Sequence, residues 1–253
     1  MVIHLEKRKK LTVVAAGGDG TISAVAGELA GTSALLGVIP MGTLNHFAKD
    51  LGLPLDIESA LAVIKEGRVR SVDIAEADDR VFINNSSVGL YPHLVRLREH
   101  HQSRLRLSKG WAMLRAAATL LHRIPTLEVQ LNVDGKKLVR HTPFVFVGNN
   151  QYHADGLKIG NRVCLDEGVL SIFTTHHVGR LGFFRLVLKA MFGLLHADKD
   201  FDSFKVTEIR IDVSGHSHDV SFDGEVVRMK SPIHYRVRPK ALQVIVSREP
   251  KSR

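Results

Sequence analysis

The pattern of apolar and polar positions near the start of the chain predicts a strand, a glycine turn and a helix. Residues 11–16 are apolar and partly β-branched, which is typical of a buried strand, and the Gly17–Thr21 turn ends it. Apolar positions 22, 25, 26 and 29 then follow the spacing of one helix face over 22–30. This order of strand, turn and helix is the start of a βα unit.

A second unit of the same kind follows directly. Residues 35–39 indicate another buried strand, which ends in the turn Pro40–Thr43, and residues 44–51 indicate a helix that closes at Gly52. One more amphipathic helix is predicted over 57–66. The βαβα alternation favours a parallel sheet with helical cover.

The rest of the chain changes to short strands, which predicts a second, mainly β part. Two apolar stretches with interspersed basic residues, 105–123 and 181–196, predict helices inside it. We place the boundary near residues 67–72, which gives domains 1–70 and 71–253. The predicted strands are 72–77, 80–87, 127–133, 143–148, 169–175, 204–213, 218–222, 233–238 and 242–247.

The composition is that of a folded globular protein. Of 253 residues, 44% are hydrophobic and 24% are charged, which fits neither a disordered chain nor a multi-span membrane protein. Cys164 is the single cysteine, and the N-terminus lacks the apolar core of a secretory signal. No uncharged apolar run reaches the length of about 18 residues that a spanning helix needs. We expect a cytoplasmic protein that contacts the inner face of the membrane only peripherally.

Positive charge is concentrated in regions. The net charge is +9; residues 96–123 carry 7 basic and 1 acidic side chains, and residues 228–253 carry 8 and 1. Such fields attract phosphates, nucleic acid or an anionic bilayer. The predicted basic helices have the pattern of bilayer-interface helices, although packing on a sheet gives the same pattern. Nucleic acid is not an expected partner, because no recognised nucleic-acid-binding module accompanies the basic stretches.

The turn Gly17-Gly18-Asp19-Gly20-Thr21 is the most informative motif. Glycines let backbone N–H groups approach a phosphate, the following helix adds a favourable dipole, and Thr21 adds a hydroxyl donor. The motif is neither a P-loop nor a complete G-x-G-x-x-G fingerprint. A plain strand-to-helix turn capped by Asp19 is the structural alternative.

The turn Pro40–Asn45 repeats this arrangement after the next predicted strand, and Thr43 follows its glycine. In an open α/β sheet, ligands lie outside the carboxyl ends of the strands, so the two turns are expected to face one crevice. Together they favour a phosphate site more strongly than either motif does alone.

Asp223-Gly224-Glu225 lies between two short strands late in the chain. A carboxylate in this place would suit proton transfer from an attacking hydroxyl during phosphoryl transfer. A hairpin turn through Asp-Gly explains the same tripeptide without any chemistry. The residues alone leave both interpretations open.

Five motifs share an order and an approximate spacing that is specific. They are Val13–Thr21, Gly37–Ala48, Asn84–Gly89, Asp-Glu-Gly at 166–168 and Asp-Gly-Glu at 223–225. In this order they resemble the diacylglycerol kinase catalytic family of bacterial lipid kinases, to which sphingosine and ceramide kinases are related. The resemblance covers nearly the whole chain.

The resemblance implies a fold and an activity. The fold would be an α/β nucleotide-binding domain with a parallel sheet, similar to that of phosphofructokinases and NAD kinases, followed by a mainly β sandwich domain. The active site would lie in the cleft between them and would perform ATP-dependent phosphorylation of a lipid hydroxyl, with a diacylglycerol-like lipid as substrate.

The resemblance also implies site residues. Glu225 matches the usual proton acceptor, and Asp223 is a competing candidate. A structural Mg²⁺ would bind the carbonyls of Cys164 and Val169 and the carboxylate of Glu167, all hard oxygen donors; Glu stands where the family commonly has Asp. The residues that would hold the ATP phosphates and Mg²⁺ are Gly17, Gly18, Asp19, Gly20, Thr21 and Thr43.

The start of the chain departs from the family. Family members begin with a strand and an Asn-Pro turn, one βα unit before the first glycine motif, whereas 16 residues precede Gly17 here. A catalytically weak or inactive nucleotide- or lipid-binding homologue is therefore an alternative. An NAD kinase-like enzyme acting on a soluble substrate shares the first turn but does not account for the run Gly42–Ala48. The sequence names neither the particular lipid nor the oligomeric state.

Overall fold

The computed structural model describes both predicted parts of the chain. The predicted helices over 105–123 and 181–196 lie outside the described residues, apart from position 182. Within the described ranges, none of the helices has the length and apolar character needed to span a bilayer. The described residues are 2–7, 10–89, 127–133, 136–152, 162, 164–175, 182 and 201–248.

The first part is built on three parallel strands. β2 (Lys10–Gly17) and β3 (Leu35–Pro40) run parallel, and the last strand, β15 (Ile233–Val246), joins β3 in the same direction. β1 (Val2–Lys7) pairs antiparallel with β2, because a link of only residues 8 and 9 permits a hairpin but no crossover. The predicted parallel sheet is therefore corrected to a mixed one, with parallel strands at its centre.

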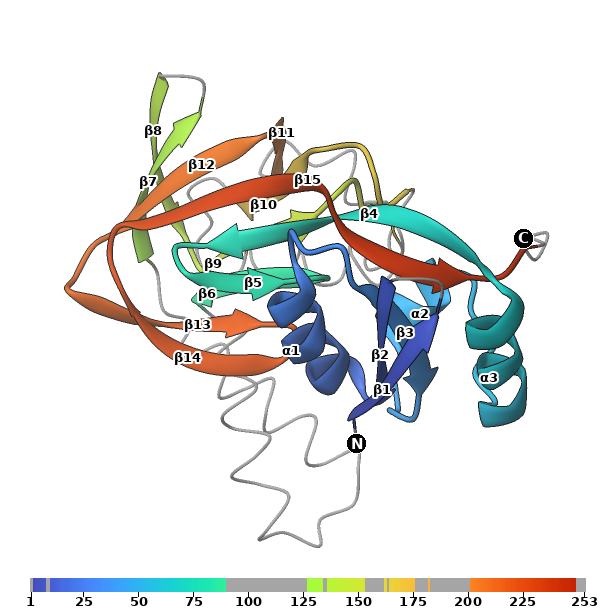
Figure 1. Cartoon of the computed structure of the whole chain (residues 1–253). Helices are drawn as coiled ribbons and strands as arrows, with labels where there is room; N and C mark the ends of the chain where they lie inside the picture. Colours follow the sequence, from blue (N-terminus) through green and yellow to red (C-terminus); the bar gives the residue numbers. More distant parts are fainter. Residues whose placement is uncertain are drawn as a thin grey trace, which may run out of the picture.

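Helices cover both faces of these strands (Figure 1). α1 (Asp19–Leu29) and α2 (His46–Asp50) pack on one face, and α3 (Ile57–Glu66) packs on the other. All residues of β3 are buried, which is the pattern of a strand covered on both sides. The two glycine turns follow directly at the carboxyl ends of β2 and β3.

The second part is a sandwich of two sheets around one apolar core. Its antiparallel sheet has the order β11, β10, β9, β6, β13, β14, and it faces β4, β15, β12 and β7 of the first sheet. The strand bounds are β4 (Arg68–Ala77), β5 (Arg80–Phe82), β6 (Asn85–Gly89), β7 (Leu127–Val133), β8 (Lys136–Thr142), β9 (Phe144–Asn149), β10 (Leu170–Thr175), β11 (Phe201–Val206), β12 (Glu208–Val213), β13 (Ser217–Phe222) and β14 (Glu225–Lys230).

β15 belongs to both parts of the molecule. Its first half pairs with β12 and β4, and after a bulge between Arg238 and Leu242 its second half pairs with β4 and β3. The long strand crosses the upper half of Figure 1, beside β4. Both strands run through the two parts of the fold, and the division into domains 1–70 and 71–253 stays a prediction.

Most predicted elements are confirmed, although several ends differ. α3 has the predicted bounds. α2 begins at His46 rather than at residue 44, because Asn45 adopts a left-handed conformation (φ 51°). The predicted strands 80–87 and 204–213 are each two strands, whereas 233–238 and 242–247 are one.

Candidate active site

The two glycine turns lie against each other, as the neighbouring strand ends predict. Gly17 and Pro40 are paired at the ends of β2 and β3, and the N–H of Met41 donates to the carbonyl of Gly17 at 2.8 Å. A Cβ on Gly42 would stand 2.6 Å from the Cα of Gly18. Glycine at position 42 therefore lets the two backbones touch.

Asn45 fixes the shape of the second turn. Its Oδ1 accepts from the N–H of Gly42 at 2.8 Å, and its Nδ2 donates to the carbonyl of Gly42 at 2.8 Å. Thr43, between these two residues, is exposed. The threonine hydroxyl is thus presented from a rigid turn, next to the first glycine motif.

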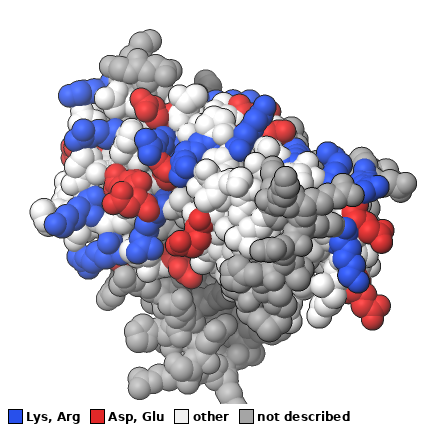
Figure 2. All heavy atoms as spheres, viewed as in Figure 1, with Lys and Arg blue, Asp and Glu red and all other residues white. Residues whose placement is uncertain are grey.

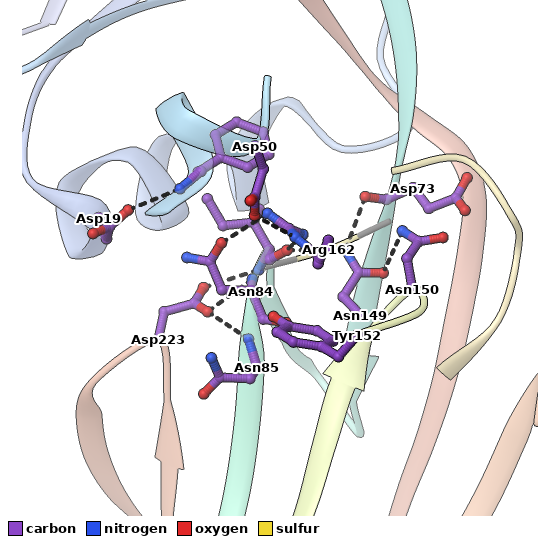
Figure 3. Close-up of polar contacts among 12 residues, drawn as sticks. Asp19, Asp50, Asp73, Asn84, Asn85, Asn149, Asn150, Tyr152, Arg162 and Asp223 are labelled. Atoms are coloured by element: carbon purple, nitrogen blue, oxygen red, sulfur yellow. Dashed lines mark hydrogen bonds and ion pairs between the residues drawn. The ribbon is translucent and has the colours of Figure 1, made fainter. Parts of the chain in front are cut away.

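Asp19 joins the first turn to α2 (Figure 3). Its Oδ1 accepts from the N–H of Phe47 at 3.2 Å, within the first turn of α2. α1 begins after Gly18 and has no side-chain cap of its own. The structural alternative that Asp19 caps its own helix is therefore wrong, because the carboxylate is used by the neighbouring helix.

The start of α1 offers backbone donors rather than side chains. The first N–H groups of a helix have no intrahelical acceptor, and they carry the positive end of its dipole. Gly17, Gly18 and Gly20 leave this end of the helix without bulky side chains, while the side chain of Thr21 lies over Gly17. The arrangement is one that a phosphate group fits.

Asp223 occupies the tip of the β13–β14 hairpin. Asp223 and Gly224 both have positive φ (47° and 95°), as a tight hairpin turn requires, so the turn interpretation of this tripeptide is confirmed. The carboxylate of Asp223 accepts from the hydroxyl of Ser23 at 2.5 Å. Its other donors are the backbone N–H groups of Ile83 at 2.9 Å, Asn84 at 2.9 Å and Asn85 at 3.0 Å.

These contacts place Asp223 between the two parts of the fold. Ser23 comes from α1, whereas the three backbone donors come from the link between β5 and β6 and from Asn85, the first residue of β6. Burial raises the pKa of the Asp223 carboxyl above its ordinary value, and the four donors oppose this rise. Each oxygen of the carboxylate accepts two hydrogen bonds, so Asp223 anchors the hairpin to α1.

Glu225 is exposed beside the first turn of α1. Its Oε1 lies 3.5 Å from the position that a Cβ on Gly20 would occupy. The fold thus brings both carboxylates of the tripeptide to the start of α1: Asp223 contacts Ser23, and Glu225 lies beside Gly20. Ser23 and Asp223 are 200 residues apart in sequence.

A cleft begins at this point and follows α1. It has a volume of about 490 Å³ and opens between α1 and the strands of the sandwich. Small residues on one stripe of α1 leave the space, and Val81, Phe222 and Val227 form apolar walls. The complete lining is Gly20, Ser23, Ala24, Gly27, Glu28, Asp79, Arg80, Val81, Phe222, Asp223, Glu225 and Val227.

The segment with the predicted structural metal ligands lies apart from this cleft and is fixed by protein groups. Asp73 accepts from the N–H groups of Gly168 at 2.6 Å and Lys240 at 2.7 Å. The carbonyl of Val169 accepts from the N–H of Asn150 at 2.8 Å.

Its chemistry gives limited support for a metal. Glu167 is exposed, and burial raises the pKa of the Cys164 thiol. Two carbonyls and one carboxylate are oxygen donors that suit Mg²⁺. The metal role of Cys164, Glu167 and Val169 stays a prediction.

Sequence reasoning missed a buried ion pair behind the site. Arg162 donates through Nε to Asp50 Oδ2 at 2.7 Å, and its side chain is wholly buried. No periodicity or motif marks either residue. A buried arginine of this kind is found only when distant segments are brought together.

Comparison with known proteins agrees with these features. The Diacylglycerol kinase catalytic domain family matches residues 1–77, and the YegS C-terminal NAD kinase beta sandwich-like domain family matches residues 95–246. The second match covers more than half of the chain. The first match ends with β4, and the second contains most strands of the sandwich together with β15.

Individual relatives support the same grouping. The chain is 31% identical over 171 residues to a YegS-like protein of Cronobacter sakazakii, whose name assigns it to the lipid kinases; 64% of this chain and 55% of that protein are covered. It is 32% identical over 163 residues to the diacylglycerol kinase of Staphylococcus aureus, with 63% and 51% covered. The chain therefore spans about half the length of the curated relatives it matches.

A solved structure shows that the fold is shared. A crystal structure of a Bacillus anthracis protein, described as a diacylglycerol kinase, matches with a TM-score of 0.70 and 26% identity, over 94% of this chain and 78% of that one. The predicted fold class, an α/β part followed by a β sandwich, is confirmed. Because the second model matches more than half of the chain, this chain belongs to the YegS C-terminal NAD kinase beta sandwich-like family, and its residues 1–77 match the Diacylglycerol kinase catalytic domain.

Proposed function

We propose that this chain acts as an ATP-dependent lipid kinase, which transfers the terminal phosphate of ATP to a hydroxyl of a diacylglycerol-like lipid. The observation that carries the proposal is the position of Glu225 beside the first turn of α1, with Oε1 3.5 Å from the place of a Cβ on Gly20. Phosphoryl transfer to a hydroxyl requires a phosphate cradle and a proton acceptor within one site. Family membership supports the same reaction.

The glycine turns would bind the phosphates of ATP. Backbone N–H groups at the start of α1 are oriented donors, and the lack of side chains at Gly17, Gly18 and Gly20 lets phosphate oxygens reach them. Thr43, exposed on the adjoining turn, would add a hydroxyl donor.

Asp19 is the residue best suited to hold Mg²⁺ with the nucleotide. Its Oδ1 is anchored by the N–H of Phe47, so the orientation of the carboxylate is fixed before the ion binds. The exposed hydroxyl of Thr21 lies two residues away. Mg²⁺ would neutralise part of the charge on the phosphates.

We assign the role of general base to Glu225. The two oxygens of Asp223 already accept four hydrogen bonds from protein donors, so no acceptor position is left for the hydroxyl of a substrate. Glu225 is exposed and lines the cleft, where an acceptor hydroxyl would lie. Asp223 would instead hold the hairpin that carries Glu225.

The acceptor lipid would enter the cleft between α1 and the sandwich. Apolar walls of Val81, Phe222 and Val227 suit the hydrocarbon part next to the reacting hydroxyl. The lipid has to be reached at a bilayer surface, and we propose peripheral contact with an anionic membrane. In the described part of the face shown in Figure 2, Lys and Arg side chains lie interspersed with Asp and Glu.

A labelled-phosphate assay tests the proposal. ATP carrying a labelled γ-phosphate is incubated with Mg²⁺ and mixed micelles of diacylglycerol, monoacylglycerol, sphingosine, ceramide or phosphatidylglycerol. We expect label in a phosphorylated lipid, greatest with diacylglycerol and absent when EDTA removes Mg²⁺. Transfer to NAD instead would favour the NAD kinase-like alternative. No transfer to any acceptor would favour a non-catalytic binding protein.

A further inference from the structure

Arg162 is a buried cation that the proposed chemistry does not use. Its side chain has 0% exposed area, and all three guanidinium nitrogens donate hydrogen bonds (Figure 3). Nε donates to Asp50 Oδ2 at 2.7 Å, Nη1 to the carbonyl of Ile83 at 2.5 Å and Nη2 to Asn84 Oδ1 at 2.9 Å. Arg162 therefore links α2 with the segment between β5 and β6.

On the α2 side, Arg162 reaches the first glycine turn through one intermediate residue. Asp50 ends α2, and the guanidinium lies 5.8 Å from the centre of the Phe47 ring in the same helix. The N–H of Phe47 donates to Asp19. Arg162 thus fixes the helix that orients the carboxylate of Asp19.

On the sandwich side, Arg162 supports the cradle of Asp223. Three successive N–H groups, from Ile83 to Asn85, converge on that carboxylate. Arg162 donates to the carbonyl of Ile83 in the same segment. The hydroxyl of Tyr152 donates to the carbonyl of Asn84 at 2.7 Å, and burial raises the pKa of Tyr152 to about 12, which keeps this donor protonated.

We propose that Arg162 is a positioning residue that couples the two sides of the site. It holds the turn of Asp19 and the hairpin of Glu225 in one fixed geometry, through Asp50 and Phe47 on one side and through residues 83–85 and Asp223 on the other. Stability alone does not call for a buried ion pair, because apolar residues of similar volume are often as stabilising. The planar guanidinium group of arginine, in contrast, donates hydrogen bonds to several acceptors in fixed directions, which an apolar side chain cannot do.

Amide hydrogen exchange tests the coupling without reference to activity. Arg162→Lys keeps the charge but loses the fork, and Arg140→Lys is the matched control because Arg140 pairs with Asp202 at 2.8 Å between β8 and β11. We expect faster exchange in Arg162→Lys both at 46–50 and at 223–225, and no change at these positions in Arg140→Lys. Faster exchange on one side only, or on neither, would overturn the coupling. If Arg162→Lys does not fold, Asp50→Asn provides the same comparison.

A kinetic cycle tests the consequence for phosphoryl transfer, and this arm rests on the proposed function. Misplacement of the reacting groups by about 1 Å can lower the rate by about 10²-fold, so we expect Arg162→Lys to lower kcat by about 10- to 100-fold per folded molecule. In a Glu225→Gln background, the same substitution should lower kcat by a smaller factor than in the wild type, because the part of its effect that acts through Glu225 is already lost. Multiplicative effects would contradict the proposal. An inactive wild type would refute the proposed function, while hydrogen exchange would still decide the role of Arg162.

Discussion

Gly42 lies so close to Gly18 that no side chain fits between the two turns, because a Cβ there would stand 2.6 Å from a backbone atom. Gly20 differs, since a Cβ there would meet only Glu225 Oε1, at an ordinary 3.5 Å. Asp223 is likewise fixed by backbone N–H groups. At the scale of residues, the site thus depends on the close contact between the backbones of the two glycine turns and on carboxylates held by backbone N–H groups.

The two glycines predict opposite outcomes for the same substitution. Gly42→Ala forces the turns apart, and overpacking of this kind lowers the free energy of unfolding by about 1–3 kcal/mol. Gly20→Ala, in the first turn of a helix, should leave it unchanged or raise it by up to about 1 kcal/mol. Urea unfolding of both variants provides the comparison. Equal losses of stability would contradict the contact between the turns.

The carboxyl of Asp223 predicts a dependence of stability on pH. Burial raises its pKa in the folded state above the ordinary value of 3.8, so folding favours the protonated form. The contribution of this proton to the free energy of unfolding is fully present below the ordinary pKa. It is lost as the pH rises through the pKa of the folded state. Asp223→Asn has no such proton to lose. In urea unfolding, the free energy of unfolding of the wild type should therefore fall relative to that of Asp223→Asn as the pH rises above 3.8. A relative rise would contradict this prediction.

The sequence predicted residues that form local motifs and missed those that act at a distance. The glycine turns and the Asp-Gly-Glu tripeptide have recognisable spacing, and the fold brings them together. Arg162, Asp73 and Asn150 are single polar residues whose contacts come from remote segments. Nothing in the neighbouring sequence distinguishes them from surface residues.

At the scale of elements, the helices and strands with a regular spacing of apolar residues were the ones predicted correctly from the sequence. α3 has a clear apolar face and its predicted bounds are confirmed. β8 was not predicted, because its sequence is mostly polar and cationic and it lies at the end of its sheet. The bulge in β15 made one strand resemble two. Where a strand ends depends on which neighbouring strand pairs with it, and the local pattern of apolar and polar residues does not contain that information.

The cap of α3 gives a prediction confined to one element. Asp56 Oδ1 accepts from the N–H of Ser59 at 2.8 Å, and the helix packs on the face of the sheet opposite α1. Asp56→Ala should lower the free energy of unfolding by about 1 kcal/mol. The affinity for ATP, measured by calorimetry, should not change. A lower affinity would contradict the placement of the nucleotide at α1.

At the scale of the whole molecule, the last strand completes the first sheet. β15 leaves the sandwich and lies between β3 and β4, so the two parts share a backbone ladder. The hairpin of β13 and β14, just before it in sequence, reaches α1. The sequence predicted two parts in succession; their shared strand could not be predicted, because a return of this kind has no local signature.

Membrane association is a property of the whole molecule, and we predict that it is electrostatic. Each Lys or Arg near an anionic surface contributes about 1 kcal/mol, and salt screens this attraction. Binding to vesicles that contain phosphatidylglycerol should therefore fall steeply between low and physiological salt in a sedimentation assay. Vesicles of neutral lipid are the control. Vesicle binding that does not change with salt concentration would contradict this prediction and would indicate that apolar side chains insert into the bilayer.

The rate of a single turnover in Glu225→Gln tests the central claim most directly. If Glu225 accepts the proton of the lipid hydroxyl beside the glycine turn, the rate constant should fall by about 10²-fold or more, since general-base catalysis contributes 10²- to 10⁴-fold. The affinities for ATP and for lipid should stay within about twofold of the wild type, because the Glu225 side chain is exposed and has no hydrogen bond or ion pair with the described residues. A rate constant within a few-fold of the wild type would contradict the assignment of Glu225 as the base of this site.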